Sequence, residues 1–368
     1  MTATRATSPS STPRPPSRTP PARRRSPPAS TPCSAPERHP LADPRHRVPS
    51  TGTWTLTSRG PLGDDGGQMI DVLALDVGQT GVRSLLTVAD STRPGAELPG
   101  IVATQPLLPQ VAAHIATLAD GESIAAVSIG ASGLGAADSA RTLADLLPGR
   151  VRSVHIAHDS VTSYLGALGD VSGAVVAAGT GAVTLAAGPG GVRRVDGWGH
   201  LLGDEGAGFW IGREALSAVL RAWDGRGPAT SLSDVAEREF GDLDGLYLTI
   251  QAAPDRVSRI AAWGRHVAEH AATDPVSADI SHRAGARLAE SVAAGLRAVG
   301  ADAVASRVGN VFRNPVIAES FTTEMQRLVP GIDLREPLGD GLAGAALLPG
   351  LGAASALAEV VDHYTVAA

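Results

Sequence analysis

Residues 196–212 read Asp-Gly-Trp-Gly-His-Leu-Leu-Gly-Asp-Glu-Gly-Ala-Gly-Phe-Trp-Ile-Gly and hold six glycines and two tryptophans. Glycine permits positive φ and close backbone approach, at an entropic cost that a purely structural loop would avoid. Apolar residues at helical spacing then predict a helix from about Gly208 to Trp223. Asp204 and Glu205 precede it, where we expect their carboxylates to satisfy its free N–H groups. Taken alone, the stretch fits a capped helix after a loop as well as a ligand site.

The 368 residues divide into two parts by composition. Residues 1–68 are rich in Pro, Ser, Thr and Arg, and their 10 basic and 4 acidic residues give a balance of +6. Such a segment cannot bury enough apolar surface to fold, so we expect a disordered tail, or one that is not translated, with Met69 as the start. The rest holds 21 basic and 33 acidic residues, a balance of −12, which argues against a nucleic-acid partner.

Residue counts exclude several classes of protein. The chain contains no lysine, whereas a P-loop kinase needs one in its Gly-Lys-Ser/Thr motif. The single cysteine, Cys33, cannot form an internal disulfide or a cysteine-ligated zinc or iron–sulfur site within one chain. A reducing cytoplasm is the natural setting. No apolar run approaches the length of a bilayer span, so no membrane partner is expected.

Two halves with the same order of elements follow the tail. In the first half, the residue pattern predicts strands over 70–75, 82–88, 124–129 and 151–156. It predicts helices over 107–118, 136–147 and 159–168. In the second half, the pattern predicts strands over 173–178, 182–187, 192–195, 303–308 and 332–335. It predicts helices over 208–223, 231–240, 256–271, 276–299, 315–328 and 342–348. The first half offers no third strand to match the one at 192–195.

A hairpin that feeds strand–helix units implies a mixed sheet with helices on its faces. The repeated order therefore predicts an α/β protein with two lobes, 69–169 and 170–368, the second with a helical insertion at about 225–275. Ligands are expected in the cleft between such lobes.

Glycine turns lie at matching places in the two halves. Asp76-Val77-Gly78-Gln79-Thr80 is a D-x-G-x-T turn whose backbone N–H groups and Thr80 hydroxyl suit an anion, while Asp76 suits Mg²⁺ through water. Gly179-Thr180-Gly181 occupies the same position in the second half. Each turn alone also fits an ordinary hairpin. Two such turns, one per lobe, are what a nucleotide between the lobes requires.

Other candidate residues follow buried strands. Asp159 opens a helix, where it fits both an N-cap and a general base for an attacking hydroxyl. His158 fits packing better than catalysis. Gly309-Asn310-Val311-Phe312 ends a strand, and its glycine would let a flat base stack on the backbone. His266-Val267-Ala268-Glu269-His270 has the H-x-x-E-H spacing of a zinc site, although the solvated face of an inserted helix is the favoured interpretation.

In combination, these motifs resemble the N-acetylglucosamine kinase and BadF-type ATPase family, within the sugar-kinase/actin/heat-shock-chaperone superfamily. The resemblance covers about 70–350 and is carried, in the family's order, by Asp76–Thr80 (phosphate one), Ala178–Gly181 (phosphate two) and Gly309–Phe312 (adenosine). Its most specific part is Gly197-Trp198-Gly199-His200-Leu201-Leu202-Gly203-Asp204-Glu205-Gly206. It implies duplicated ribonuclease H-like, actin-like ATPase lobes with a cleft between them.

The resemblance also implies site residues. Asp159 matches the family's catalytic base, and Thr180 and Gly181 match positions between sugar and phosphates. ATP with Mg²⁺ is the implied phosphoryl donor, with Asp76 holding the metal through water. The residues implied for ATP are Asp76, Gly78, Gln79, Thr80, Gly179, Thr180, Gly181, Gly309 and Asn310. Those implied for the sugar are Ser132, Gly133, Asp159, Thr180, Trp198, Gly199 and Asp204.

We therefore expect a cytoplasmic, ATP-dependent kinase for the 6-hydroxyl of N-acetylglucosamine or a related hexosamine. The family's sugar-binding Asn has no counterpart in 91–114, so the identity of the sugar stays open. Glucosamine kinase, N-acetylmuramic acid kinase and a non-catalytic nucleotide or sugar sensor are the alternatives. A monomer and a homodimer are both compatible with the sequence.

Overall fold

Two mixed β-sheets organise the described residues, which in this computed structural model are 69–366 without Gln79, Asp90, Ala103, Pro148 and Arg150. The expected tail, 1–68, lies outside the described residues. All described residues belong to one compact unit of the chain. Among them, no helix has both the length and the apolar character needed to cross a membrane.

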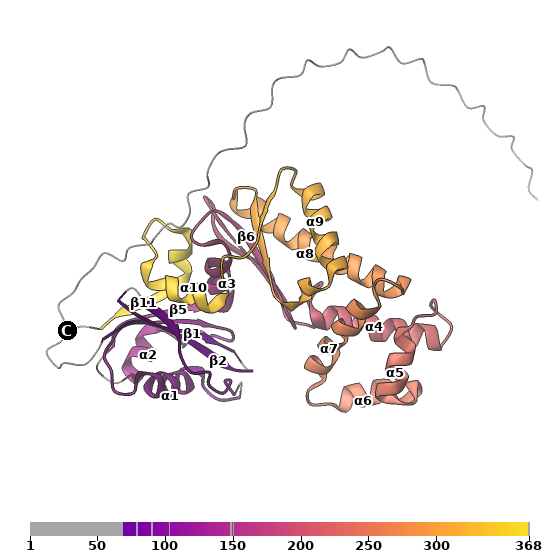
Figure 1. The fold of residues 1–368 in the computed structure, drawn as a ribbon, viewed down its shortest axis with the longest axis horizontal. Coiled ribbons are helices and arrows are strands. Elements are labelled where there is room, and N and C mark those ends of the chain that lie inside the picture. The colour runs from indigo at the N-terminus through magenta and orange to yellow at the C-terminus, as the bar shows by residue number, and fades with distance from the viewer. Residues whose placement is uncertain are drawn as a thin grey trace, which may run out of the picture. The chain divides into compact units, whose positions relative to one another are not determined.

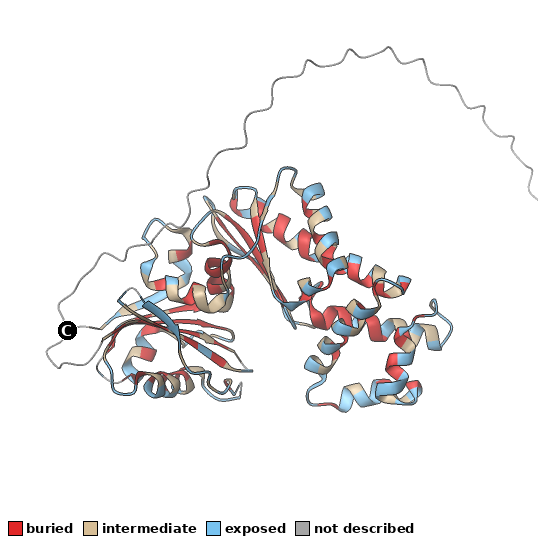
Figure 2. Ribbon diagram, in the orientation of Figure 1, coloured by how far each residue is buried: buried red, intermediate tan, exposed pale blue. Residues whose placement is uncertain are grey.

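The first sheet has the strand order β11-β5-β4-β1-β2-β3 (Figure 1). β1 runs antiparallel to β2 and parallel to β4, which in turn runs parallel to β5. α1 and α2 share an apolar core with one face of this sheet, where Leu73, Ile115 and Leu143 are fully buried (Figure 2). The bounds are β1 (Ile70–Val77), β2 (Val82–Val88), β3 (Ser91–Pro94), α1 (Leu107–Ala119), β4 (Ile124–Ala131), α2 (Ala140–Leu146), β5 (Val151–His158) and β11 (Val361–Thr365).

Two strands of this sheet differ from the sequence-based expectation. β3 supplies the third strand of the first half, but its four residues are exposed and have no apolar alternation. β11 pairs antiparallel with β5, so the last strand extends the first sheet, although 170–368 was expected to form the second lobe. Helix α2 begins at Ala140 rather than 136, because the Ser139 hydroxyl accepts a hydrogen bond from the Thr142 N–H and caps it.

The second sheet has the order β10-β9-β6-β7-β8, with β9 parallel to β6 and the hairpin strands antiparallel. Helix α8 packs on β6, β7 and β8, and α9 packs on α8. The bounds are β6 (Gly173–Ala178), β7 (Ala182–Gly188), β8 (Gly191–Asp196), α8 (Pro275–Val299), β9 (Val304–Val308), α9 (Pro315–Leu328) and β10 (Asp333–Arg335). This core is built from the apolar sides of these elements, with Phe321 and Met325 fully buried.

Four helices lie in the sequence between β8 and α8, and they are α4 (Gly208–Trp223), α5 (Leu232–Phe240), α6 (Leu246–Ala252) and α7 (Arg256–His270). Helix α4 has the bounds that its apolar spacing predicts. It packs closely against α7 because Gly212 has no side chain: a Cβ there would lie 1.8 Å from the Ile260 carbonyl oxygen. The sequence did not predict α6, whose exposed residues include Tyr247 and Leu248.

Helix α3 (Asp159–Leu168) contacts both sheets and therefore connects the two cores. Val161 and Leu165 pack with Val175 and Leu185 of the second sheet. On another side, α3 crosses α10 (Gly341–Leu347), which covers β1. A Cβ on Gly344 would lie 1.8 Å from the Thr162 carbonyl oxygen, so only glycine permits this crossing. It brings the first residues of α10 against the first turn of α3.

Candidate active site

The carboxyl ends of three parallel strands gather the predicted residues of the first half. In register, Asp76 of β1 lies beside Gly130 of β4, and Ala131 lies beside His158 of β5. Asp159 follows directly as the first residue of α3. A Cβ on Gly130 would lie 2.3 Å from the Thr162 hydroxyl, so the missing side chain lets α3 approach this edge. Asp76 and Asp159 therefore share one edge of the sheet.

Asp159 begins α3 but does not cap it. The N-cap is His158, whose Nδ1 accepts a 3.2 Å hydrogen bond from the Ser160 N–H and lies 2.8 Å from Asp159 Oδ1. A single Nδ1 either donates to the carboxylate or accepts from the N–H, so its tautomer decides which contact forms. The Asp159 side chain is 41% exposed and open to a ligand. The N-cap interpretation of Asp159 is corrected in favour of His158.

The first glycine turn is closed by its own backbone. The N–H of Gly78 donates to the Gly81 carbonyl at 3.1 Å, and the Gly78 carbonyl accepts from the Ile101 N–H at 3.0 Å. Thr80 at its tip is exposed. Gln79 lies outside the described residues. The hairpin register that follows this turn sets Asp76 directly opposite Arg83.

Arg83 joins two carboxylates at this edge. It donates to Asp76 Oδ2 at 2.5 Å and to Asp340 Oδ2 at 2.6 Å, and the hydrogen bond to Asp76 raises the pKa of the guanidinium. Asp340 is the N-cap of α10, where its Oδ1 accepts from the Ala343 N–H at 3.0 Å. Burial acts to raise the pKa of Asp340, but the Ala343 N–H and Arg83 outweigh it and the net pKa is lowered. Arg83 therefore ties the start of α10 to the end of β1.

The carboxyl edge of the second sheet gathers the remaining glycine turns. The Gly179 N–H donates to the Gly181 carbonyl at 2.8 Å and closes the β6–β7 hairpin. Gly309, at the end of β9, has a φ of +107°, and a Cβ there would lie 2.1 Å from the Ala178 carbonyl oxygen. Only glycine fits this position. Asn310 follows, exposed, in the 3₁₀ turn Asn310–Arg313.

Helix α4 begins directly on the β6–β7 hairpin. Its Gly208 N–H donates to the Gly179 carbonyl at 2.8 Å, and its Phe209 N–H donates to the Thr180 carbonyl at 2.9 Å. The N-cap is Ala207, with no side-chain cap. The expectation that Asp204 and Glu205 cap this helix is therefore wrong: hairpin carbonyls already satisfy its first N–H groups.

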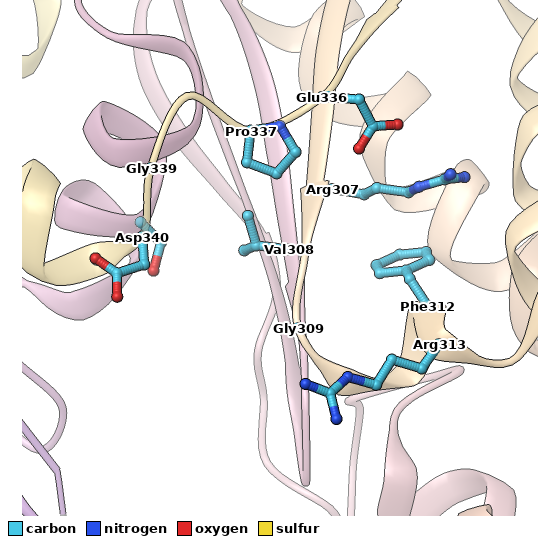
Figure 3. A pocket seen from close by; sticks show the side chains of 11 residues that line it. Arg307, Val308, Gly309, Phe312, Arg313, Glu336, Pro337, Gly339 and Asp340 are labelled. Carbon is cyan, nitrogen blue, oxygen red and sulfur yellow. The ribbon is translucent and has the colours of Figure 1, made fainter.

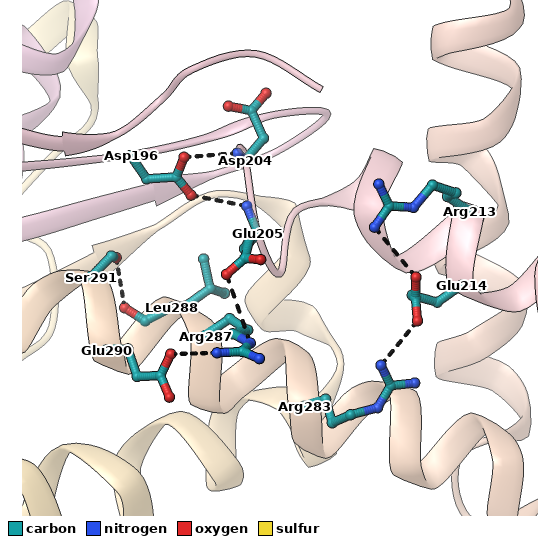
Figure 4. Close-up of polar contacts among 10 residues, drawn as sticks. All are labelled: Asp196, Asp204, Glu205, Arg213, Glu214, Arg283, Arg287, Leu288, Glu290 and Ser291. Atoms are coloured by element: carbon teal, nitrogen blue, oxygen red, sulfur yellow. Dashed lines mark hydrogen bonds and ion pairs between the residues drawn. The ribbon is translucent and has the colours of Figure 1, made fainter. Parts of the chain in front are cut away.

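Asp204 instead points into the loop and toward the hairpin (Figure 4). It is 8% exposed, its Oδ1 accepts a 3.1 Å hydrogen bond from the Gly199 N–H, and a Cβ on Gly181 would lie 2.5 Å from its Oδ2. Burial raises the pKa of Asp204, and the Asp196 charge raises it further, against the backbone N–H groups of Gly199 and Ala182 and the charge of His200. The resemblance implies a sugar contact for this carboxylate.

A pocket of 420 Å³ opens between the second glycine edge and the α3–α10 crossing (Figure 3). One side is the strand end and turn around Gly309, and the other is the segment before α10 with Ser163 of α3. Its lining residues are Ser163, Arg307, Val308, Gly309, Phe312, Arg313, Glu336, Pro337, Gly339, Asp340 and Gly341. A Cβ on Gly341 would lie 3.8 Å from Asp76 Oδ1, so the pocket reaches the edge that carries Asp76.

The predicted sugar residues fall into two groups. Ser132 and Gly133 follow β4, and Gly133 has a φ of +76° with nothing within 4 Å of a Cβ. Trp198 and Gly199 lie with Asp204 in the glycine-rich loop, where Trp198 is 62% exposed and stacks on Arg194. Within the described part of the chain, no hydrogen bond or ion pair joins Asp159 to this loop.

Sequence reasoning missed several residues of the site. Arg83 and Asp340 carry the charge beside Asp76, while Arg307, Arg313 and Glu336 line the pocket. Arg83 could have been found, because a four-residue turn between Val77 and Val82 fixes it opposite Asp76. The others belong to β9, the turn after it and the loop before α10, which only the fold brings together.

The H-x-x-E-H segment of α7 lines a separate pocket of 330 Å³. His266 Nδ1 lies 3.2 Å from Glu269, and His270 Nδ1 lies 2.5 Å from the Ser231 hydroxyl. Among the described residues, no group of three or more His, Cys, Asp or Glu side chains is placed to hold a metal ion.

The solved structures give the fold a context. A protein from Chromobacterium violaceum, provisionally named an N-acetylglucosamine kinase, is 26% identical with a TM-score of 0.60, over 76% of this chain and 99% of that one. A protein of the same provisional name from Porphyromonas gingivalis is 18% identical with a TM-score of 0.55, over 75% and 98%. These matches confirm the two-lobed, actin-like ATPase fold.

Sequence comparison assigns the family. No curated protein sequence matches the chain significantly. The model of the BadF/BadG/BcrA/BcrD ATPase family matches residues 110–349, well over half of the chain and including the hairpin, loop and pocket turn of the second sheet. By this match, the chain belongs to the BadF/BadG/BcrA/BcrD ATPase family.

Proposed function

We propose that this protein is an ATP-dependent amino-sugar kinase that phosphorylates the 6-hydroxyl of N-acetylglucosamine or a related hexosamine. The observation that carries the proposal is the pocket at Gly309, which extends to the strand edge that holds Asp76 and lies beside α3, the helix that begins with Asp159. Membership of an ATPase family supports the nucleotide, and the 26% identical structure supports the class of acceptor.

In this proposal the adenosine lies in the pocket against Gly309, Asn310 and Phe312. A pocket of 420 Å³ lies within the range of small-molecule sites, and the bare Gly309 backbone offers a flat surface to a base. The phosphates extend toward the hairpins at 78–80 and 179–181, where peptide N–H groups can donate to phosphate oxygens. Arg313, at the pocket mouth, adds a positive charge (Figure 3).

The acidic residues beside the pocket fit Mg²⁺ held through water. Asp76 and Asp340 lie on either side of Arg83, and Mg²⁺ in phosphoryl-transfer sites is usually held by one or two carboxylates and substrate phosphates. We infer that Asp76 would hold the ion, with its Oδ1 on the pocket side. When bound, the ion neutralises negative charge on the phosphates.

Asp159 is the proposed general base. Its carboxylate is partly exposed at the start of α3, and the Nδ1 of His158 lies 2.8 Å from its Oδ1. The sugar would lie between Ser132 and Gly133 on one side and Trp198, Gly199 and Asp204 on the other. There Asp159 accepts the proton of the 6-hydroxyl as that oxygen attacks the γ-phosphorus and the bond from the γ-phosphorus to the bridging oxygen of ADP breaks. Thr180 and Gly181 lie between this sugar and the phosphates.

An ADP-release assay tests the proposal over a panel of N-acetylglucosamine, glucosamine, N-acetylmuramic acid, glucose and N-acetylmannosamine. The proposal expects one amino sugar to give the highest kcat/KM and a sugar 6-phosphate as product. A glucosamine or N-acetylmuramic acid kinase would differ only in the preferred sugar. Saturable sugar or nucleotide binding with no phosphorylated product would instead support the sensor and overturn the kinase.

A further inference from the structure

The loop that carries Asp204 is closed by a second carboxylate, Asp196, at the end of β8. Asp196 Oδ1 accepts the Asp204 N–H at 2.8 Å, and its Oδ2 accepts the Glu205 N–H at 2.9 Å (Figure 4). The two oxygens of the Asp196 carboxylate therefore accept hydrogen bonds from two consecutive backbone N–H groups, those of Asp204 and Glu205, at the other end of the loop. Hydrogen bonds to a charged acceptor are stronger than neutral ones.

Asp196 makes these bonds from an unfavourable backbone conformation. Its φ is +57°, in the left-handed region where a residue with a Cβ is disfavoured. A non-glycine residue in this region is retained where its side chain makes compensating contacts. A Cβ on Gly203 would lie 2.2 Å from Asp196 Oδ1, so the loop backbone packs directly onto the carboxylate.

The contact between Asp196 and the loop backbone holds Asp204 in its position. Asp204 also has a left-handed φ, of +56°, and its Oδ1 accepts the Gly199 N–H while its Oδ2 faces Gly181 of the hairpin. The other side of the loop is supported by α8, because a Cβ on Gly206 would lie 2.5 Å from the Ala284 carbonyl oxygen. Without Asp196, the N–H groups of Asp204 and Glu205 lose their acceptor.

We propose that Asp196 is a positioning residue for the acceptor sugar: it holds the 197–205 loop closed so that the Asp204 carboxylate faces the hairpin and the incoming sugar. The role in sugar binding rests on the proposed function, whereas the loop closure itself does not. None of the residues in this contact lines the Gly309 pocket, so the effect on the KM for the sugar should exceed the effect on the KM for ATP.

Two substitutions distinguish the effect of the Asp196 carboxylate from the effect of its backbone conformation. Asp196→Gly removes both hydrogen bonds and relieves the positive φ, so the variant is expected to fold. Asp196→Asn keeps a side chain that tolerates this φ but has only one acceptor oxygen and no charge. Asp120→Gly is the matched control, because Asp120 also has a positive φ, of +44°, yet lies exposed at the end of α1.

The kinetic result expected for Asp196→Gly is a rise of about tenfold or more in the KM for the sugar, with the KM for ATP within about twofold of wild type. Asp120→Gly should change neither constant. Equal rises in both KM values, or a wild-type sugar KM in Asp196→Gly, would overturn the positioning role.

The pH profile of Asp196→Asn gives a second kinetic readout, which reports the charge that Asp204 faces. The charged groups facing Asp204 are Asp196 and His200, while Arg287 of α8 is directed to Glu205 and Glu290. Asp196 raises the pKa of Asp204, so Asp196→Asn should lower it and move the acid limb of kcat/KM for the sugar to lower pH. An acid limb that stays in place contradicts the contact.

Amide hydrogen exchange tests the loop independently of any substrate. In Asp196→Gly the N–H groups of Asp204 and Glu205 should exchange at least about tenfold faster than in wild type, whereas those of β6 should not change. Unchanged protection would overturn the inference even in an active kinase. Faster exchange in a protein that phosphorylates no sugar would leave the loop closure established and refute the proposed function instead.

Discussion

Arg83 and Asp76 face each other across the first hairpin, and the guanidinium that binds Asp76 at 2.5 Å also binds Asp340 at 2.6 Å. One side chain thus connects the strand end expected at the phosphates with the segment that lines the Gly309 pocket. Both ends of this contact are partly exposed, so its effect on folding stability should be small. Its effect on the shape of the pocket should be larger.

Replacing Arg83 with Met should therefore weaken nucleotide use more than folding. We expect kcat/KM for ATP to fall about tenfold, because the wall at 336–341 loses its tie to β1. Arg83→Lys should restore only part of this loss, since a single ammonium group cannot match the guanidinium fork. Arg93→Met, an exposed position on β3, is the control. Steady-state kinetics with varied ATP measure the effect, and an unchanged kcat/KM would refute it.

Asp159→Asn should abolish phosphoryl transfer while nucleotide binding survives. Loss of a general base typically lowers kcat by about 10²–10⁴-fold, and Asn keeps the shape of the side chain. The measurements are ADP release and calorimetric binding of ADP. Asp145→Asn on α2 removes an exposed carboxylate away from the site and should have no effect. Retained turnover in Asp159→Asn would assign the base to another residue.

Gly309→Ala should close the proposed nucleotide pocket. The new Cβ would lie 2.1 Å from the Ala178 carbonyl oxygen, so the turn must move away from β6. Gly331→Ala is a matched control, because Gly331 also has a positive φ, of +81°, but nothing lies within 4 Å of a Cβ there. We expect the Kd for ADP to rise about tenfold or more only in Gly309→Ala. Equal affinity for ADP in the two variants would show that the nucleotide does not bind at this turn.

Asp274 provides a test of stability away from the site. It caps α8 and accepts hydrogen bonds from the Thr230 hydroxyl at 2.6 Å and from the Ser277 hydroxyl at 2.8 Å. Asp274→Ala should lower the free energy of unfolding by about 1–2 kcal/mol, measured by urea unfolding at pH 7. Asp279→Ala, on the exposed face of the same helix, should cost less than about 0.5 kcal/mol.

The same residue predicts a pH dependence. Burial alone would raise the pKa of Asp274, but the hydrogen bonds from Thr230 and Ser277 outweigh it and the net pKa is lowered. A lowered pKa in the folded state stabilises the protein above the unfolded pKa, near about 4, and this contribution disappears as the pH falls through the folded value. The difference between wild type and Asp274→Ala should therefore shrink below about pH 4. A constant difference down to pH 2 would contradict this.

Much of the fold follows from local patterns. Apolar spacing and glycine turns predicted α4, β2 and β6 with their observed bounds, because these elements bury one face or both faces in a core. β3 and β11 were missed because they are exposed edge strands whose partners, not their own residues, hold them in the sheet. The start of α2 was predicted four residues too early, because the Ser139 cap was not recognised.

In the candidate site, too, some features could be predicted from local sequence and others depend on the fold. Glycines such as Gly309 could be predicted because their backbone requirement shows in the sequence. The roles of Asp340 and Asp196 could not be predicted, because they depend on hydrogen-bond partners that only the fold brings close. Asp204 was placed at the site from the resemblance, but its surroundings differ from the expected helix cap. Sequence patterns indicate backbone needs better than they indicate side-chain partners.

The return of β11 to β5 affects how the protein can be made and divided. The sheet that begins with residue 70 is completed only by residues 361–365, so it cannot be finished until the ribosome has synthesised those residues. A fragment cut at residue 169 would lack this edge strand and the helix that covers β1. Expression of the halves as separate polypeptides should therefore give an aggregation-prone first fragment, and a stop codon before 361 should leave β5 as an open sheet edge.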